Sequence, residues 1–347
     1  MKKIFFFWVQ EKIIKERKQP VLQWILKFFS FFFRFVIFIK NFLYDHGFIK
    51  VVKVNRWIVS VGNITAGGSG KTPVILFLAE KLNANFSVLI RGYGSKIKNF
   101  SIVEDRSYWQ EVGDEALLLK RRGSMEVIVG KNRVLTAEKT KNNLVILDDG
   151  FQYRRLFRDL DIVVIDGLDP FGYGDFLPHG LLRDSPKRLK TAHFLIVNNV
   201  FDEEQYQRVT KRLRVYNETA PILAFTPEIE GFYSLKGEKY KDVRKVGLFC
   251  AIAHPEYFVR LLKQKKIEIL DTLFYFDHSY FEKDILEKFW QKTKGKNANV
   301  LVCSEKDSVK LNKSISTPIV FAKMHLKPFK NDNMEKLIET LNRHVII

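Results

Sequence analysis

Short apolar runs recur between residues 57 and 197, and each is followed by a polar turn. Runs of this kind predict strands at residues 57–61, 86–90, 127–129, 144–147, 162–165 and 194–197. Apolar positions with helical spacing lie between several of them and predict helices at residues 71–82, 116–122 and 132–141. Short buried strands that alternate with helices are typical of a doubly wound, parallel α/β sheet. Ligand sites in such sheets lie beyond the carboxyl ends of the strands.

A second alternating series follows a looser stretch after residue 200. The pattern predicts a helix at 201–215, a strand at 221–225 and a polar connection at 231–242. It then predicts strands at residues 246–250, 267–275, 300–303 and 318–321, with helices at 255–265, 280–292, 306–311 and 333–344. A chain of 347 residues can form two domains. We therefore predict N-terminal helices (1–44), a core domain (45–230), a connection (231–245) and a smaller C-terminal α/β domain (246–347).

Residues 21–44 form an apolar, phenylalanine-rich stretch that three basic residues interrupt. Its longest uncharged run is six residues, which is short of the roughly 18 that indicate an ordinary transmembrane helix. At about 100° per residue, its polar side chains share a stripe about 60° wide, formed by Gln23, Lys27, Ser30, Arg34 and Asn41. Lys40 lies off this stripe, where it could snorkel to the interface.

A narrow basic stripe and a broad aromatic face favour a helix in the membrane interface, partly sunk into one leaflet. The basic side chains would then meet anionic lipid head groups. No small-residue cleavage site follows, so the stretch does not read as a signal peptide. The alternative is a buried amphipathic helix that packs against the rest of the protein.

The chain is strongly basic, with a formal net charge of +19. Such a balance indicates an anionic partner, which by charge alone could be a membrane surface, a phosphorylated substrate or nucleic acid. The two cysteines, Cys250 and Cys303, each lie in an apolar run. This placement predicts buried, reduced thiols without a disulfide or a metal role.

Residues 57–73, WIVSVGNITAGGSGKTP, have the parts of a phosphate-binding loop: a strand, a glycine-rich turn, Lys71-Thr72 and a helix. Glycines allow backbone N–H groups to turn toward an anion, and the helix N-terminus adds its positive dipole. Lys71 could reach terminal phosphates, and the Thr72 hydroxyl could bind Mg²⁺. The usual pattern places glycine where this chain has Thr65. The alternative is a glycine-rich turn before an unrelated helix.

Carboxylates at other predicted strand ends and helix starts could complete the chemistry. Asp148 and Asp149 follow an apolar strand, as in a Walker B element, where either could hold Mg²⁺. Asp114 and Glu115 precede a helix and could act on an acceptor hydroxyl, or Asp114 could be a helix N-cap. The Asp-His pair at residues 277–278 is either a second titratable pair at the site or part of a surface loop. The glycine-rich loop at 171–184 is a candidate lid or acceptor-site loop.

The combined motifs resemble the tetraacyldisaccharide 4′-kinase family of the lipid A pathway in Gram-negative bacteria. They recur in the family's order from about residue 45 to 325, and the P-loop of the family has the same GGxGKT form. The matching segments are SVGNITAGGSGKTP (60–73), RGYG (91–94), VGDEALLL (112–119), LDDGFQ (147–152), GYGDFLPHGLLRD (172–184), FCAIAHPEYF (249–258), FDHSYF (276–281) and SEKDSVKL (304–311). Leu181 and Asp184 depart from the family's usual proline and glutamate.

The resemblance implies transfer of the ATP γ-phosphate to the 4′-hydroxyl of a tetraacylated glucosamine disaccharide 1-phosphate, which gives lipid IVA. It implies an enzyme anchored by its N-terminal helix at the cytoplasmic face of the inner membrane. It assigns the base role to Asp114, with support from His278, and Mg²⁺ binding to Thr72 and to Asp148 or Asp149. It assigns ATP binding to Thr65, Ala66, Gly67, Gly68, Ser69, Gly70, Lys71 and Thr72.

The acceptor disaccharide phosphate would meet a further set of polar residues. Glu115 belongs to the same motif as the proposed base. Arg91 and Arg183 are candidate clamps for substrate phosphates, or ion-pair partners on the surface. Two other functions compete with the lipid kinase. One is a membrane-associated nucleotide switch or ATPase without a small acceptor. The other is a nucleic-acid-binding ATPase, but no recognisable binding module supports it, and we expect no nucleic-acid partner.

Overall fold

The computed structural model describes residues 20–82, 85–92, 95, 97, 99–277, 279–312, 315–330 and 332–343. The strands are β1 (Trp57–Gly62), β2 (Phe86–Ile90), β3 (Phe100–Ile102), β4 (Glu126–Gly130), β5 (Leu144–Asp148), β6 (Leu160–Asp166), β7 (Phe194–Asn198), β8 (Ile222–Ser234), β9 (Lys239–Tyr240), β10 (Lys245–Cys250), β11 (Glu268–Phe274), β12 (Val300–Ser304) and β13 (Ile319–Lys330). The α-helices are α2 (Pro20–Asp45), α3 (Lys71–Lys81), α4 (Trp109–Val112), α5 (Asp114–Arg122), α6 (Arg133–Lys139), α7 (Glu203–Arg214), α8 (Pro255–Gln264), α9 (Lys283–Lys294), α10 (Glu305–Ser308) and α11 (Met334–Asn342).

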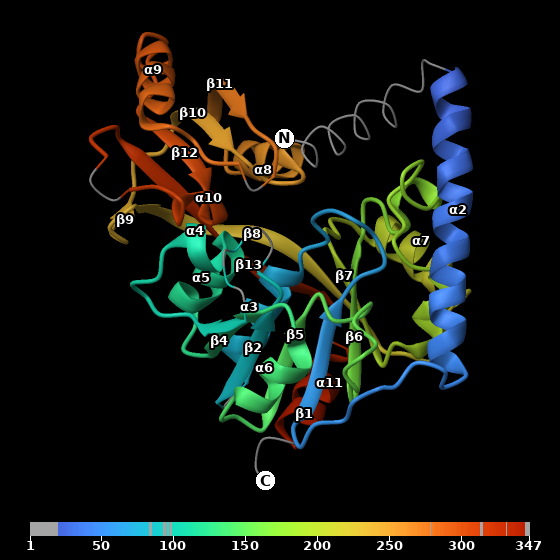
Figure 1. Ribbon diagram of the computed structural model, residues 1–347. Coiled ribbons are helices and arrows are strands. Elements are labelled where there is room, and N and C mark those ends of the chain that lie inside the picture. The colour runs from blue at the N-terminus through green and yellow to red at the C-terminus, as the bar shows by residue number, and fades with distance from the viewer. Residues whose placement is uncertain are drawn as a thin grey trace.

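The thirteen described strands form one continuous sheet, with the order β11-β10-β12-β13-β8-β7-β6-β1-β5-β2-β4-β3 and β9 beside β8 (Figure 1). The strands from β7 to β4 pair in parallel, and so do those from β11 to β13. The predicted α/β fold is therefore confirmed. The sheet is mixed, because β13 pairs with β8 and β3 with β4 in antiparallel fashion.

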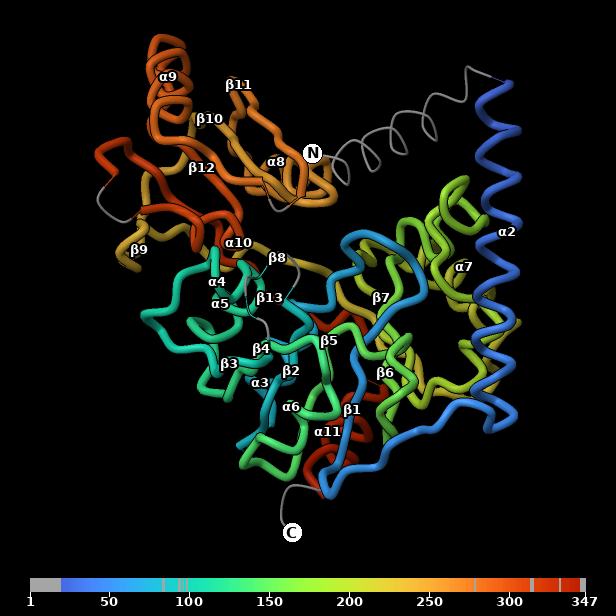
Figure 2. The backbone as a smooth tube through the Cα atoms, viewed as in Figure 1, coloured from blue at the N-terminus to red at the C-terminus, as the bar shows by residue number. Residues whose placement is uncertain are grey.

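Two long strands, β8 and β13, join the two parallel groups (Figure 2). The prediction of a polar connection at 231–242 was wrong in part, because β8 continues to Ser234 and β9 follows. The polar residues there belong to half-exposed strands, which need no continuous apolar run. The division into domains at residues 231–245 stays a prediction.

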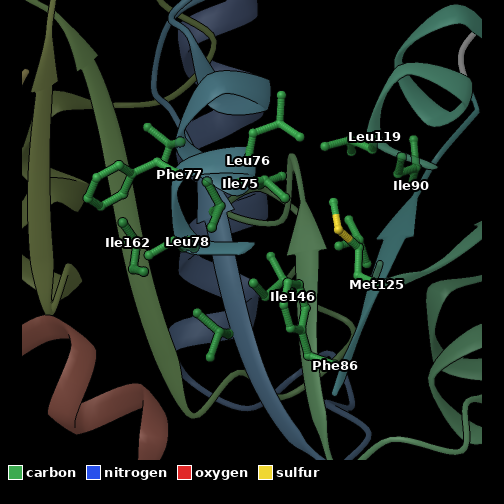
Figure 3. Close-up of a cluster of buried hydrophobic side chains, with 14 of the residues drawn as sticks. Ile75, Leu76, Phe77, Leu78, Phe86, Ile90, Leu119, Met125, Ile146 and Ile162 are labelled. Atoms are coloured by element: carbon green, nitrogen blue, oxygen red, sulfur yellow. The ribbon is translucent and has the colours of Figure 1, made fainter. Parts of the chain in front are cut away.

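The middle of helix α3, residues 74–78, is buried against the sheet. Its residues Ile75, Leu76, Phe77 and Leu78 pack over Ile146 and other strand residues in one core cluster (Figure 3). A helix that is apolar on most of its surface is typical of such a buried position. Leu337 and Leu341 of α11 belong to the same cluster. The end of the chain thus packs against the half that holds the glycine-rich loop. Both cysteines are buried and free, as predicted.

Helix α2 stands along one side of the molecule and is long and apolar enough to cross a membrane by length and composition (Figure 1). Its aromatic face points away from the protein, and Trp24 is 75% exposed and Phe28 69% exposed. Only the basic side chains of its polar stripe were predicted to meet lipid head groups, and Lys27 and Arg34 are exposed. Ser30 and Asn41, the uncharged members of the same stripe, are buried against the protein. Their small polar side chains find hydrogen-bond partners there.

Candidate functional site

The glycine-rich loop follows the central strand β1 and leads into α3. Gly67 and Gly70 have positive φ angles of 99° and 84°, which an L side chain rarely adopts. The side-chain amide of Asn198 donates to the carbonyls of Ser69 and Gly70 at 3.1 Å each. The amide of Asn63 donates to Ser69 Oγ at 2.8 Å. The loop is therefore held from both sides by the ends of β1 and β7.

Thr65 occupies the position where the usual motif has glycine. It forms an antiparallel bridge with Leu182 from the loop at 172–184. The next N–H, of Ala66, donates to the carbonyl of Leu181 at 2.6 Å. Because this part of the P-loop is extended and paired, a β-branched residue suits it. The loop at 172–184 thus packs directly on the P-loop, which agrees with its prediction as a lid or acceptor-site loop without testing that role.

Lys71 begins α3, and its Nζ lies 3.4 Å from Asp149 Oδ1. Arg183 also donates to the Asp149 carboxylate, with one contact at 2.8 Å, and the buried Arg133 donates to the Asp149 carbonyl at 3.0 Å. Burial by itself would raise the pKa of Asp149, but Lys71 and Arg183 hold it well below its usual range. In this structure Arg183 is therefore an ion-pair partner, which is the alternative that the sequence left open.

Asp148 lies in a different environment although it is the next residue. It ends β5, in register with Val61 beside the glycine-rich loop. Its Oδ1 atom is buried and has no hydrogen-bond partner among the described residues. Burial raises the pKa of Asp148 to about 7, and the nearby charge of Glu115 adds to the rise. A buried carboxylate oxygen without a partner is a ready ligand for a cation.

These residues fit a nucleotide-type Mg²⁺ site. Within the described ranges, no group of three His, Cys, Asp or Glu side chains could hold a metal ion alone. Mg²⁺ at nucleotide sites takes one or two protein oxygens and completes its shell with phosphates and water. The Thr72 hydroxyl in the first turn of α3 and the unpartnered Asp148 oxygen are the two groups that could hold such an ion.

The first turn of α5 meets α10 from the other half of the molecule. Lys306 Nζ lies 2.9 Å from Glu115 Oε1 and 3.0 Å from Asp277 Oδ1. Burial by itself would lower the pKa of Lys306, but Glu115, Asp114 and Asp277 hold it well above its usual value. Lys310 Nζ lies 4.0 Å from Asp114 Oδ2. The two lysines therefore join both carboxylates of the GDE segment to the C-terminal half.

Asp114 is buried and is the first residue of α5, while Gly113 occupies the N-cap position. The suggested N-cap role of Asp114 is therefore not what the structure has. Lys310 also donates to the carbonyl of Ser279 at 2.8 Å. His278, the predicted support for Asp114, lies outside the described residues. Arg91 follows β2 at the carboxyl edge of the sheet and is exposed.

The segment after β10 also contacts the P-loop. A Cβ atom added to Gly68 would lie 3.1 Å from the Cβ of Ala253. The neighbouring His254 ring stacks on Tyr257 with 4.8 Å between centroids, and the Tyr257 hydroxyl donates to Asp166 at 3.4 Å. The two halves of the chain therefore meet on both sides of the P-loop, at this contact and at the junction of α5 with α10.

Sequence reasoning missed several residues of this arrangement. Asn198 holds the glycine-rich loop, Arg133 holds the backbone at Asp149, and Lys306 joins the two halves. Asn198 ends a predicted strand at the edge where ligand sites lie, so its position was a usable signal. Lys306 stands in the SEKD segment, and nothing local in the sequence indicates that it is buried among carboxylates. Arg133 opens an ordinary helix, and its burial depends on distant chain segments.

Comparisons with known proteins show which family this chain resembles. Residues 22–343 match the LpxK family model, described as tetraacyldisaccharide-1-P 4′-kinase. The tetraacyldisaccharide 4′-kinase of Chlamydia abortus is 38% identical over 77% of this chain and 75% of its own. That of Syntrophus aciditrophicus is 32% identical over 90% of this chain and 91% of its own.

A crystal structure of LpxK from Aquifex aeolicus in complex with ATP superposes with a TM-score of 0.72 and 27% sequence identity, covering 92% of this chain and 99% of that one. The family match extends over nearly the whole described chain, and the P-loop, the two aspartates and the GDE segment all lie within it. This chain therefore belongs to the tetraacyldisaccharide-1-phosphate 4′-kinase family, LpxK.

Proposed function

We propose that this chain transfers the γ-phosphate of ATP to the 4′-hydroxyl of tetraacyldisaccharide 1-phosphate. The membership in the kinase family supports the reaction. The observation that carries the proposal within the structure is the convergence of three groups: the P-loop Lys71, the Asp148 carboxylate with one oxygen unpartnered among the described residues, and the acids Asp114 and Glu115 that begin α5. The lysine would bind the triphosphate, Asp148 the divalent cation, and the acids of α5 the acceptor hydroxyl.

ATP would lie with its phosphates on the loop formed by residues 65–72. The positive φ angles at Gly67 and Gly70 favour backbone N–H groups turned toward an anion. Lys71 would leave Asp149 to contact the terminal phosphates, because a polyphosphate offers it more negative charge than one carboxylate. Mg²⁺, held by Thr72 and Asp148, would neutralise charge on the transferring phosphate.

Asp114 would act as the base for the acceptor. Its carboxylate is buried at the start of α5 and would accept the proton of the 4′-hydroxyl as the oxygen attacks phosphorus. The new bond joins the 4′-oxygen to the γ-phosphorus, and the bond to ADP breaks. His278 would support Asp114. Glu115 would contribute to the acceptor site, where Lys306 holds it.

Arg91 and Arg183 would bind substrate phosphates at the carboxyl edge of the sheet. For Arg183 this requires release from Asp149, its partner in the present structure. Binding of the ATP phosphates, which would release Lys71 from Asp149, would also release Arg183, because both cations pair with this one carboxylate. Binding of an anion would therefore exchange one set of ion pairs for another.

The reaction would take place at a membrane surface, at the cytoplasmic face of the bacterial inner membrane where ATP is present. The outward aromatic face of α2, including Phe28, Phe31 and Phe35, supports lipid contact. The exposed side chains of Lys27 and Arg34 remain able to meet anionic head groups. The lipid substrate would then reach the site without leaving the bilayer.

A direct assay tests the proposed reaction. The full chain is incubated with labelled ATP, Mg²⁺ and tetraacyldisaccharide 1-phosphate in detergent micelles, and labelled lipid is measured. We expect labelled lipid, and its absence above background would sink the proposal. Steady ATP hydrolysis without labelled lipid would instead favour the nucleotide switch or ATPase.

Two substitutions test the assigned roles. Lys71→Ala removes the phosphate contact, and Asp114→Asn removes the base while keeping its shape. Each is expected to lower kcat by roughly 100-fold or more. Lys81→Ala, at the other end of α3, and Glu111→Gln, in α4, are matched controls with expected near-normal turnover. Near-normal turnover by Asp114→Asn would remove that residue from the base role.

Removal of residues 1–44 tests the membrane proposal. We expect the shortened protein to be more soluble and less active on substrate embedded in vesicles, because the outward apolar face of α2 is gone. Sedimentation with vesicles measures the binding. If the shortened protein still fractionates with vesicles, another surface must anchor it.

A further inference from the structure

Two small polar residues attach α2 to the loop at 172–184. Ser30 Oγ donates to the carbonyl of Phe176 at 2.8 Å, and it lies 3.0 Å from Asp175 Oδ1. Eleven residues later, the amide of Asn41 donates to Asp184 Oδ1 at 2.9 Å. Both helix residues are buried, in contrast to the aromatic side chains around them. The inward side of α2 is therefore a specific docking face, fixed to both ends of one segment.

The far side of that segment contacts the P-loop. The N–H of Arg183 donates to the carbonyl of Ile64 at 2.9 Å, and the carbonyl of Leu181 accepts from Ala66 at 2.6 Å. The Arg183 side chain binds Asp149, the partner of Lys71. Asp184 thus contacts α2 directly. Its neighbour Arg183 contacts Asp149 at the proposed nucleotide site.

Within the described residues, the Asp184 side chain hydrogen-bonds to Asn41 and to the N–H of Ser185, and the charges of Lys40 and Arg188 lie nearby. The side chain of Asp184 is only 2% exposed, so water cannot readily substitute for a lost donor. Its Oδ1 also accepts the N–H of Ser185 at 2.8 Å, and this local bond does not reach α2.

We propose that Asn41 is a positioning residue for phosphoryl transfer, which holds the segment at 181–184 against the P-loop through the carboxylate of Asp184. The helix that faces lipid and the loop that would bind nucleotide then move as one unit. The docking of α2 thereby sets the geometry of Arg183 and, through Asp149, of Lys71. The expected change in kcat rests on the proposed kinase function. The expected change in local structure does not depend on that function.

The test uses the full chain and three variants in mixed micelles. Asn41→Ala removes the donor, and Asn41→Asp places a second carboxylate against Asp184. The double variant Asn41→Asp with Asp184→Asn exchanges the two groups, so that the amide at 184 donates to the carboxylate at 41 and still accepts from Ser185. Asn55→Ala, the same change at an exposed position, is the matched control.

We expect Asn41→Ala to lower kcat by about 10- to 100-fold, as small misplacements in active sites do, with the KM for the lipid changed less than threefold. Asn41→Asp should be the most impaired, and the double variant should recover to within about threefold of the unmodified chain. Binding to lipid vesicles should stay unchanged in all variants, because the outward face of α2 is intact. Asn55→Ala should match the unmodified chain throughout.

Amide hydrogen exchange provides a readout that needs no turnover. In Asn41→Ala the amides of Ala66 and Arg183 should exchange faster, while those of the core strand β5 should not change. Faster exchange everywhere, with a lowered Tm, would indicate general destabilisation and overturn the proposal. So would normal kcat in Asn41→Ala, or no recovery in the double variant. If the unmodified chain makes no labelled lipid, the proposed function fails, and local exchange still decides whether Asn41 holds the segment.

Discussion

The carboxylate of Asp149 lies 3.4 Å from the ammonium group of Lys71, and it also binds Arg183. The P-loop lysine therefore forms an ion pair with Asp149 in this structure. Among the described residues, the adjacent Asp148 forms no ion pair, and its Oδ1 lacks a hydrogen-bond partner. Two neighbouring aspartates thus differ in their electrostatic environment, and this difference leads to opposite predictions for their substitution.

Asp149→Asn is expected to destabilise the nucleotide-free protein at pH 7. The pKa of Asp149 is held well below its usual value in the folded state. Its contribution to stability is therefore present above pH 4 and is lost as the pH falls toward the folded pKa. Loss of charged hydrogen bonds should lower the free energy of unfolding by about 2 kcal/mol at pH 7. Thermal unfolding at pH 7 and at steps below pH 4 measures it, and an unchanged Tm at pH 7 would contradict it.

Asp148→Asn is expected to stabilise the nucleotide-free protein above pH 7. The folded pKa of Asp148 is raised to about 7, so the folded state holds a proton that the unfolded state releases near pH 4. Stability from this residue is full below the unfolded pKa and declines as the pH rises through the folded pKa. The gain on substitution should be about 2 kcal/mol at pH 8.

The same Asp148→Asn variant should lose kinase activity and Mg²⁺ dependence of nucleotide binding, because the neutral amide is a weaker ligand for Mg²⁺. Urea unfolding at pH 5 and pH 8 and calorimetric titration of Mg²⁺ with an ATP analogue measure the two effects. Glu138→Gln, a change of one carboxylate in the nearby helix α6, is the matched control. A lower stability at pH 8 together with normal Mg²⁺ binding would contradict the assignment.

Lys306→Met is expected to destabilise the protein by about 2 kcal/mol, because it leaves the partly exposed carboxylates of Glu115 and Asp277 without their shared cation. Lys296→Met is the matched control, because Lys296 pairs with Asp271 at the surface and should contribute less than about 1 kcal/mol. Chemical denaturation measures both. Equal effects of the two substitutions would mean that the junction between α5 and α10 contributes little.

Gly70→Ala is expected to lower both stability and nucleotide affinity. Gly70 has a φ of 84°, and an added Cβ would overlap the side-chain amide of Asn198. Gly237→Ala is the matched control, because Gly237 has a φ of 93° but open space around the added atom. The control should lose about 1–2 kcal/mol from backbone strain alone. A larger loss in Gly70→Ala, with at least tenfold weaker binding of an ATP analogue, is the expected result, and equal losses with normal binding would refute it.

The sequence by itself determined the features that depend on neighbours along the chain. Apolar runs predicted the parallel strands, and the order of glycines, Lys71 and Thr72 predicted the P-loop that follows β1. The register of parallel strands then brings Asp148 to the same edge as Gly62. These predictions succeeded because strand burial and tight turns leave local marks in the sequence.

Only the tertiary structure decided which side of α2 faces the protein. The same amphipathic pattern is compatible with a helix that contacts lipid and with one that packs on a protein surface. The tertiary structure also decided that Asp149, and not Asp148, holds Lys71, because β5 ends at Asp148 and Asp149 turns away from the strand with a φ of 55°. The burial of Lys306 among acids from α5, 191 residues away in sequence, could not be read from its own segment. Such contacts are set by how distant elements pack, and no short stretch of sequence records their partners.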